Sequence, residues 1–162
     1  MDSKELAYFI DACRRGDDTE VAQLCDLFPL LINAKDVKGF TPLIIAVYNN
    51  QSKVVPLLIE KGADVNAQDA AGNTALMGAC FKGYAEMAEL LIDAGADVNL
   101  RNFQGAPALT FAATFGQLII AERLLQNGAK VDLPDSRGKT SADHAAIQEN
   151  AEMLALFERY KI

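Results

Sequence analysis

Residues 36–68 read "DVKGFTPLIIAVYNNQSKVVPLLIEKGADVNAQ", and the same order of residue types returns in the stretches that follow. The end of the stretch is the best preserved part. It reads "EKGADVNAQD" at 60–69, "DAGADVNLRN" at 93–102 and "QNGAKVDLPD" at 126–135. The interval is 33 residues each time. A fixed interval of this size predicts a solenoid, in which similar small units stack side by side.

Four residue columns share this interval and set the register of the units. Two columns hold glycine, one holds alanine and one holds leucine. They are Gly39, Gly72, Gly105 and Gly138; Gly62, Gly95 and Gly128; Ala46, Ala79, Ala112 and Ala145; and Leu43, Leu76 and Leu109. Because the four columns agree in register, the repeat is the architecture of the chain and not one duplicated segment.

Within each unit the residue order predicts a turn followed by two short helices. An Asp or Asn opens the turn, where its side chain can accept hydrogen bonds from nearby backbone amides. A glycine follows three residues later and supplies a backbone conformation that other residues avoid. Thr-Pro-Leu or a variant then begins a first helix, which carries small residues such as Ala46. The second helix carries larger ones such as Leu57 and Leu58, and Gly62 follows its end.

This pattern resembles the ankyrin repeat, whose 33-residue unit reads Asp-x-x-Gly-x-Thr-Pro-Leu, two helices and Gly-Ala-Asp-x-Asn. The resemblance implies an all-α solenoid of helix-turn-helix units with β-turn or hairpin fingers, in a single domain. The expected units are an N-terminal cap repeat at 1–35, full repeats at 36–68, 69–101 and 102–134, and a C-terminal cap repeat at 135–162. Polar residues in both terminal units favour a complete array with capped ends.

The chain departs from the family pattern at the starts of the first helices. The family's histidine after Thr-Pro-Leu is replaced in all four units that carry the turn, so the hydrogen bonds of that histidine are expected to be lost or replaced. The residues there are Ile44, Met77, Thr110 and Asp143. Pro107 stands where a capping threonine is expected, which predicts a less firmly started helix. Gly78 lies inside a predicted helix, at a cost of about 1 kcal/mol relative to alanine.

Composition and charge exclude several classes of function. A chain of 162 residues, about half of them hydrophobic, suits one domain with a sizeable core. Its apolar runs are shorter than a membrane span, and its first residues lack the apolar segment of a secretory signal. We therefore predict a soluble, cytoplasmic protein with no membrane partner. The net charge of −7 predicts no nucleic-acid partner. Three cysteines without CxxC spacing indicate a reducing compartment.

No catalytic motif stands out, and we predict no enzyme activity, no cofactor and no metal site. The single histidine, His144, lies near Ser141 and Asp143, but residues so close on one short helix fan around it and do not converge. A hydrolase that uses Ser141 or His144 is therefore the weakest alternative. Cys13 and Cys80 fall in the small-residue slot of a first helix, where a thiol acts as an apolar filler.

The ankyrin resemblance also implies where a partner binds, on a concave groove of finger tips and first helices. In the family, sequence varies most at five places per unit, three on the finger and two at the end of the first helix. On this chain the finger positions are Val37, Lys38 and Phe40; Ala70, Ala71 and Asn73; Phe103, Gln104 and Ala106; and Ser136, Arg137 and Lys139. The helix positions are Tyr48 and Asn49; Phe81 and Lys82; Thr114 and Phe115; and Ile147 and Gln148.

These positions hold five aromatic residues, several bases and no acid, although acids outnumber bases 22 to 15 in the chain. Arg14 and Arg15 extend the basic row into the first unit. Rings and bases without acids are typical of the centre of a protein interface. We predict a monomeric adaptor or scaffold that binds an acidic or mixed apolar and acidic protein segment. Three alternatives stay open: an inhibitor of a partner enzyme, self-association through the rings, and rings that pack between units instead of binding.

Overall fold

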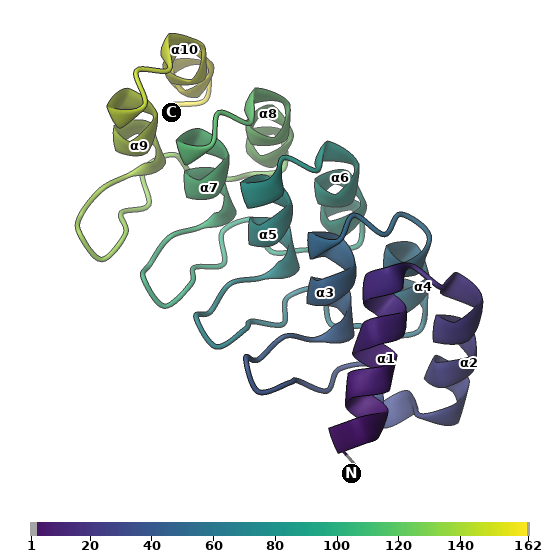
Figure 1. The fold of residues 1–162 in the computed structure, drawn as a ribbon. Helices are drawn as coiled ribbons and strands as arrows, with labels where there is room; N and C mark the ends of the chain where they lie inside the picture. The colour runs from purple at the N-terminus through teal and green to yellow at the C-terminus, as the bar shows by residue number, and fades with distance from the viewer. Residues whose placement is uncertain (1–2, 162) are drawn as a thin grey trace.

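The computed structural model describes residues 3–161, which form helices joined by turns and contain no β-strand. In chain order the helices are α1 (Ser3–Arg15), α2 (Asp18–Leu27), the short 3-10 helix η1 (Pro29–Leu31), α3 (Pro42–Tyr48), α4 (Val54–Glu60), α5 (Ala75–Lys82), α6 (Ala85–Asp93), α7 (Ala108–Thr114), α8 (Leu118–Gln126), α9 (Ser141–Ile147) and α10 (Ala151–Arg159). Each unit contributes one odd-numbered and one even-numbered helix, and the units follow one another in order along the stack (Figure 1).

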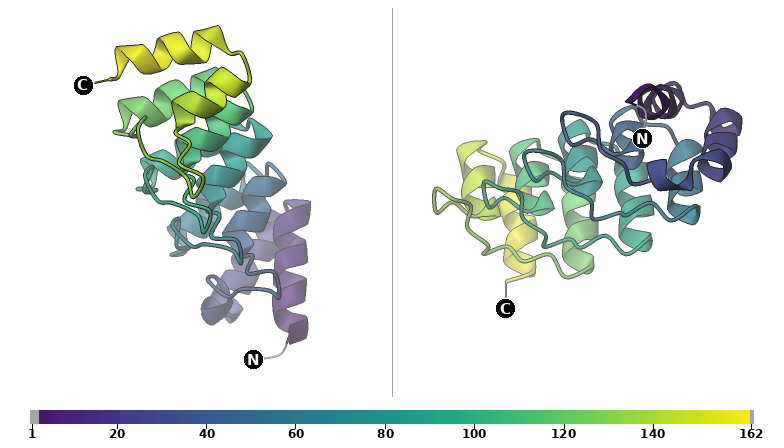
Figure 2. Two further views of the ribbon diagram at one scale, coloured as in Figure 1. Left: turned by 90° about the vertical axis from the view of Figure 1, so that its left-hand side faces the viewer. Right: turned by 90° about the horizontal axis from the view of Figure 1, so that it is seen from below.

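The helices form two rows that lie against each other. The odd-numbered helices pack in sequence, α1 on α3, α3 on α5, α5 on α7 and α7 on α9, and the even-numbered helices form the second row (Figure 2). The alanine column of the odd-numbered row is completely buried. Small residues let the helices of this row approach closely, while the larger residues of the even-numbered row fill the space between rows. The predicted order of a first helix with small residues and a second helix with larger ones is confirmed.

A finger connects each unit to the next, and its opening Asp or Asn holds it in shape. The Asp36 carboxylate accepts hydrogen bonds from the amides of Lys38 and Phe40, at 2.8 and 2.9 Å. Asp69, Asn102 and Asp135 make the same pair of bonds in their own fingers. The predicted turn chemistry is confirmed. A methyl group built on Gly39, whose φ is +78°, would lie 2.5 Å from the Ala70 amide nitrogen of the next finger.

Hydrogen bonds between layers recur at the same places in successive units. In each finger pair a backbone amide donates to a carbonyl of the preceding finger. These bonds run from Ala70 to Lys38 at 3.1 Å, from Phe103 to Ala71 at 3.1 Å and from Ser136 to Gln104 at 2.8 Å. At the base of the fingers, side chains donate forward to the next layer: Lys35 to the Gln68 carbonyl, Gln68 to the Arg101 carbonyl and Arg101 to the Pro134 carbonyl.

Asparagine side chains connect the turns after the even-numbered helices. Asn33 donates to the Gly62 carbonyl at 3.1 Å and accepts from the Asp64 amide at 2.8 Å. Asn99, two layers further on, makes the same two bonds: it donates to the Gly128 carbonyl and accepts from the Lys130 amide, each at 2.9 Å. Asn66 accepts the equivalent amide bond from Asp97. The conserved ending of the 33-residue unit is therefore a connection between layers.

The starts of the first helices differ as the sequence predicts. Thr41, Thr74 and Thr140 cap α3, α5 and α9 with their hydroxyl groups, whereas Pro107 gives α7 no side-chain cap. At two of the positions where the family has histidine after Thr-Pro-Leu, the residue of this chain bonds to the capping threonine instead. The Met77 sulfur accepts from the Thr74 amide, and the Asp143 carboxylate accepts from the Thr140 amide at 2.8 Å.

Candidate partner-binding face

The finger and helix positions named above lie on one side of the stack, which we call the inner face. It consists of the fingers and the exposed residues of α1, α3, α5, α7 and α9. The fingers project beyond the odd-numbered helices on this side (Figure 1). The predicted helix residues lie in or directly after α1, α3, α5, α7 and α9, in the odd-numbered row, and the others lie on the fingers.

The aromatic residues of the inner face fall into two groups. Phe40 and Tyr48 are half-buried, with ring centroids 6.3 Å apart, and both pack against the core. Phe81 and Phe115 form an edge-to-face pair at 4.8 Å, yet keep exposed fractions of 44% and 47%. Phe103, on the third finger, is 72% exposed. Phe81, Phe115 and Phe103 therefore form the exposed group, and only this group offers large apolar surface to a partner.

Gly78 explains why Tyr48 belongs to the half-buried group. A methyl group built on Gly78 would lie 2.9 Å from Cε2 of Tyr48, so the missing side chain leaves the place that the ring occupies. Burial, and secondarily the charge of Asp69, raises the pKa of Tyr48 above its usual value. The packing alternative therefore applies to Tyr48, while Phe81 packs on Phe115.

The predicted basic residues also fall into two groups. Lys38, Lys82, Arg137 and Lys139 are exposed and form no ion pair with any described residue. Arg15 contacts Asp11 at 2.8 Å and Glu20 at 2.7 Å, and Arg14 lies 3.4 Å from Asp11. Two acids therefore compensate Arg15, whereas Asp11 compensates Arg14 only in part. Sequence reasoning missed the contact with Glu20 because that residue comes from α2, whereas the contacts with Asp11 follow from its spacing of three and four residues on α1.

The remaining predicted residues differ in what their side chains offer. Val37 is fully exposed at the first finger, and the Gln104 side chain is exposed on the third. The Asn49 amide donates to the Ile45 carbonyl, the Thr114 hydroxyl donates to the Thr110 carbonyl, and the Asn73 amide oxygen accepts from Asn102. The polar groups of Asn49, Asn73 and Thr114 thus take part in internal bonds.

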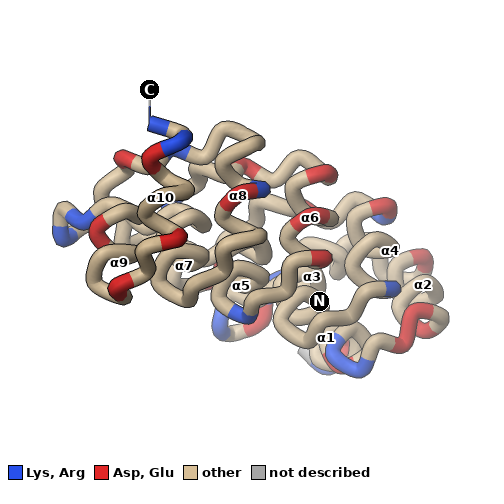
Figure 3. The backbone as a smooth tube through the Cα atoms, turned by 90° about the horizontal axis from the view of Figure 1, so that it is seen from above, with Lys and Arg blue, Asp and Glu red and all other residues tan. Residues whose placement is uncertain are grey.

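Most acidic residues of the helices belong to the even-numbered row, and α3, α5 and α7 carry none (Figure 3). Helices α3, α5 and α7 contain no acid, whereas α2, α4, α6, α8 and α10 each contain at least one. Some of these acids pair across layers, as Lys61 does with Asp26 at 2.6 Å and Arg123 with Asp93 at 3.0 Å. We call α3, α5 and α7 the acid-free strip of the inner face; the acids Asp36 and Asp69 belong to the fingers beside it.

Comparison with known families decides the identity of the fold. A family model described as ankyrin repeats (3 copies) matches residues 9–102 and again residues 76–160. The chain belongs to the ankyrin-repeat family. A search of curated proteins gave no match. Ankyrin repeats are generally modules for protein–protein interaction and are typically not enzymes.

The ankyrin stack keeps apart the residues that a hydrolase would need. Ser141 is completely buried and shares a hydrogen bond of 3.1 Å with Thr110. His144 instead contacts Asp135 at 2.9 Å, and that bond, followed by the Lys139 amide, lowers the pKa of Asp135 to about 2. Asp143 caps α9. Each of the three side chains therefore has a structural partner of its own.

The cysteines of the ankyrin stack are buried thiols. Burial raises the pKa of Cys13 to about 12 and raises that of Cys80 as well. A thiol of this kind is not ionised at neutral pH, so it is a poor nucleophile. Among the described residues no group of three or more His, Cys, Asp and Glu is arranged to hold a metal ion. Helices long and apolar enough to cross a membrane are also absent from residues 3–161.

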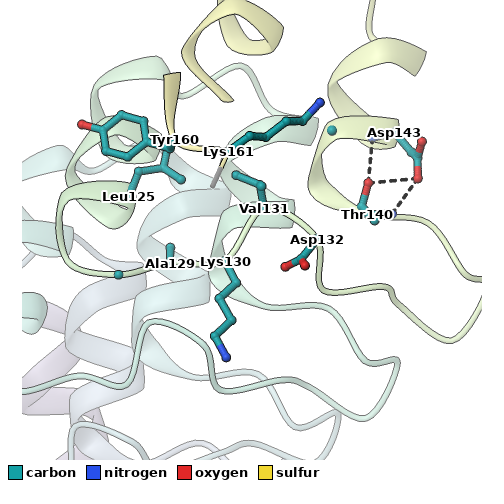
Figure 4. Close-up of a pocket in the computed structure, with 11 residues that line it drawn as sticks. Leu125, Ala129, Lys130, Val131, Asp132, Thr140, Asp143, Tyr160 and Lys161 are labelled. Carbon is teal, nitrogen blue, oxygen red and sulfur yellow. Dashed lines mark hydrogen bonds between the residues drawn. The ribbon is translucent and has the colours of Figure 1, made fainter. Parts of the chain in front are cut away.

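A pocket lies at the C-terminal end of the ankyrin stack, away from the predicted site residues. The turn after α8, the start of α9 and the residues after α10 surround it (Figure 4). Asp132 lies on its wall, in the position that Asn33, Asn66 and Asn99 hold in earlier layers. No sixth layer follows within the described residues, so this pocket is the open end of the stacking surface.

Proposed function

We propose that this ankyrin protein is a non-enzymatic adaptor that binds a partner protein through its inner face. The observation that carries the proposal is the exposed pair of Phe81 and Phe115 in a strip without acids. Large half-exposed rings that already support each other are suitable anchors, because little side-chain freedom is lost when a partner covers them. The five units from 1–35 to 135–162 are proposed to act together as one binding domain.

The charges beside the rings favour an acidic partner segment. Lys82 adjoins Phe81, and Lys38, Arg137 and Lys139 lie on the fingers without ion-pair partners among residues 3–161. A partner that covers the two rings gains about 1–2 kcal/mol from each ring. The lysines and the arginine add attraction and orientation, which salt weakens. We propose a segment that carries apolar side chains next to Asp or Glu.

The two rings provide the test of this proposal. The double variant Phe81→Ser, Phe115→Ser is expected to lose partner capture from the native lysate, with the melting temperature nearly unchanged, because both rings are already half-exposed. Ile119→Ser is the matched control, since Ile119 is an exposed apolar residue on α8 in the even-numbered row. Equal capture by wild type and the double variant would sink the proposal.

Salt dependence separates the charged part of the proposal from the apolar part. Capture by the wild type should weaken at high ionic strength, and Lys82→Ala should reduce that dependence. The acidic charge of −7 supports the exclusion of nucleic acid, and we propose that the protein acts as a monomer in the cytoplasm. Sedimentation as a dimer would contradict the monomer.

A further inference from the structure

The first finger has bonding groups that every later finger uses and that it does not use itself. Toward the preceding layer, a finger presents one backbone amide and, two residues earlier, one backbone carbonyl. In the second finger these groups are the Ala70 amide, which donates to Lys38, and the Gln68 carbonyl, which accepts from Lys35. The third and fourth fingers repeat the arrangement.

In the first finger the equivalent groups are the Val37 amide and the Lys35 carbonyl. The first unit has no finger before its odd-numbered helix within the described residues, because residues 3–8, one period before finger residues 36–41, form the first turns of α1. Among the described residues, the Val37 amide therefore has no acceptor and the Lys35 carbonyl has no donor. An amide and a carbonyl two residues apart on one edge are the groups through which an extended chain pairs with another.

An apolar notch lies beside these two groups. It is a cavity between α1 and the first finger, with Leu6, Ala7 and Ile10 on one wall and Val37 on the other. The Val37 side chain is fully exposed and Ala7 is exposed as well. An extended segment whose backbone bonds to the finger would thus place one side chain in apolar surroundings.

The charges around the notch favour acids. Arg14 and Lys35 lie on its rim and Lys38 is the next residue of the finger. The Asp36 carboxylate faces the finger backbone, where it accepts from the Lys38 and Phe40 amides. Asp11 compensates Arg14 only in part, at 3.4 Å. The rim therefore keeps a positive balance toward solvent.

We propose that the open edge of the first finger binds an extended segment of a partner protein, with one apolar side chain flanked by carboxylates. The segment takes the place of the missing finger: one of its carbonyls accepts from the Val37 amide and one of its donors bonds to the Lys35 carbonyl. This is strand-type addition at the end of the stack, separate from the Phe81 and Phe115 rings. A second copy of this chain is a poorer occupant, because its own last finger carries Arg137 and Lys139 and would meet like charges.

The probe for this site is a capped peptide, Asp-Leu-Asp-Leu-Asp, added to the isotope-labelled full chain and followed by amide and methyl NMR signals. Signals of Val37, Ala7 and Ile10 are expected to shift, with a Kd of about 0.1–1 mM for two hydrogen bonds and one buried side chain. The charge-reversed peptide Lys-Leu-Lys-Leu-Lys is expected to leave them unchanged.

The key variant is Val37→Pro, which removes only the amide donor. Val37 is the second residue of a turn closed by the bond from the Gly39 amide to the Asp36 carbonyl, a position that favours proline, so the fold should be kept. The variant should bind the acidic peptide about three- to tenfold more weakly, the worth of one hydrogen bond. Val37→Ala keeps the donor and controls for the side chain. A peptide N-methylated at its donor amides tests the Lys35 carbonyl with the wild-type protein.

Two further variants separate this site from the inner face and test the notch itself. The Phe81→Ser, Phe115→Ser variant should bind this peptide as the wild type does, so a failure here leaves the proposed function of the inner face untouched. Ala7→Glu should abolish binding, because it places a carboxylate in the notch. The proposal is overturned if the notch signals do not shift, if both peptides bind equally, or if Val37→Pro and the N-methylated peptide change nothing. A wild-type dimer that Val37→Pro dissociates would assign the edge to a second copy and overturn it too.

Discussion

Gly78 and Tyr48 show how one residue decides the role of another in the next layer. From the sequence, the glycine is a helix weakness and the tyrosine is a candidate contact residue. In the structure the glycine leaves room for the ring of Tyr48, which leans from α3 onto α5. The exposed aromatic surface of the inner face therefore begins at Phe81, one layer further on.

The pair gives a prediction at this scale. Alanine in place of Gly78 adds about 1 kcal/mol of helix propensity, but its methyl group displaces the Tyr48 ring, so Gly78→Ala should give little or no gain in stability. The pKa of Tyr48 should fall toward its ordinary value, because burial is the main cause of its rise. Ultraviolet titration against Tyr48→Phe measures this. In a Tyr48→Ala background, Gly78→Ala should instead stabilise by about 1 kcal/mol; a clear loss in that background would disprove the steric account.

Asp135 gives a prediction about pH. Its pKa is lowered to about 2 in the folded protein, chiefly by the bond to His144, from an ordinary value near 4. A carboxylate with a lowered folded pKa binds protons more readily when the chain is unfolded. Its contribution is therefore complete above about pH 4 and is lost as the pH falls toward 2. Denaturant unfolding at several pH values should show the stability advantage over Asp135→Asn shrinking through this window. Asparagine is a fair control because Asn102 makes the same turn bonds.

Single residues were predictable where their own unit determines them. The buried thiols of Cys13 and Cys80, the turn bonds of Asp36 and the missing cap at Pro107 all follow from the position in the 33-residue unit. The pairing of Arg15 with Glu20 was not predictable, because it depends on the approach of two helices.

At the scale of the helix, α7 is the odd-numbered helix of a full unit that begins without a side-chain cap. Thr41 and Thr74 accept from the third amide of α3 and α5, at 3.2 Å in both cases. Pro107 has no group that can do this, and its fixed φ is the only help it gives the helix start.

Restoring the cap should stabilise the protein. Pro107→Thr is expected to raise the free energy of unfolding by about 1 kcal/mol over Pro107→Ala, which also restores the amide but adds no cap. Comparing these two variants by chemical denaturation removes the effect of the proline ring itself. If Thr and Ala prove equally stable at position 107, the start of α7 does not limit stability.

The whole molecule is held in register by bonds that cross layers at fixed places in the unit. Asn99 is the clearest case, since its side chain both donates to Gly128 and accepts from Lys130. Asn99→Ala should lower the free energy of unfolding by about 1–3 kcal/mol through the loss of two bonds. Asn99→Asp keeps the acceptor and should cost less. Differential scanning calorimetry of both variants provides the measurement, and equal losses would assign the effect to something other than the acceptor.

The order and content of the layers could be predicted at this scale. The 33-residue period gives every layer the same two helices, one with small apolar residues and one with larger ones, and so the same way of stacking. The division of the inner-face aromatic residues into half-buried and exposed ones could not be predicted. Phe81 and Tyr48 occupy equivalent positions one period apart, yet the residue opposite each ring differs from layer to layer. The exposed fraction of a ring depends on those neighbours, and periodicity carries no information about them.

The bonds that join adjacent layers also determine how such a molecule can lengthen. Each internal layer presents the same set of donors and acceptors to the layer before it and the same set to the layer after it, so a duplicate of residues 69–101 inserted after position 101 would meet matching groups on both sides. Growth by whole periods needs no new joint, whereas an insertion of any other size would shift every donor away from its acceptor.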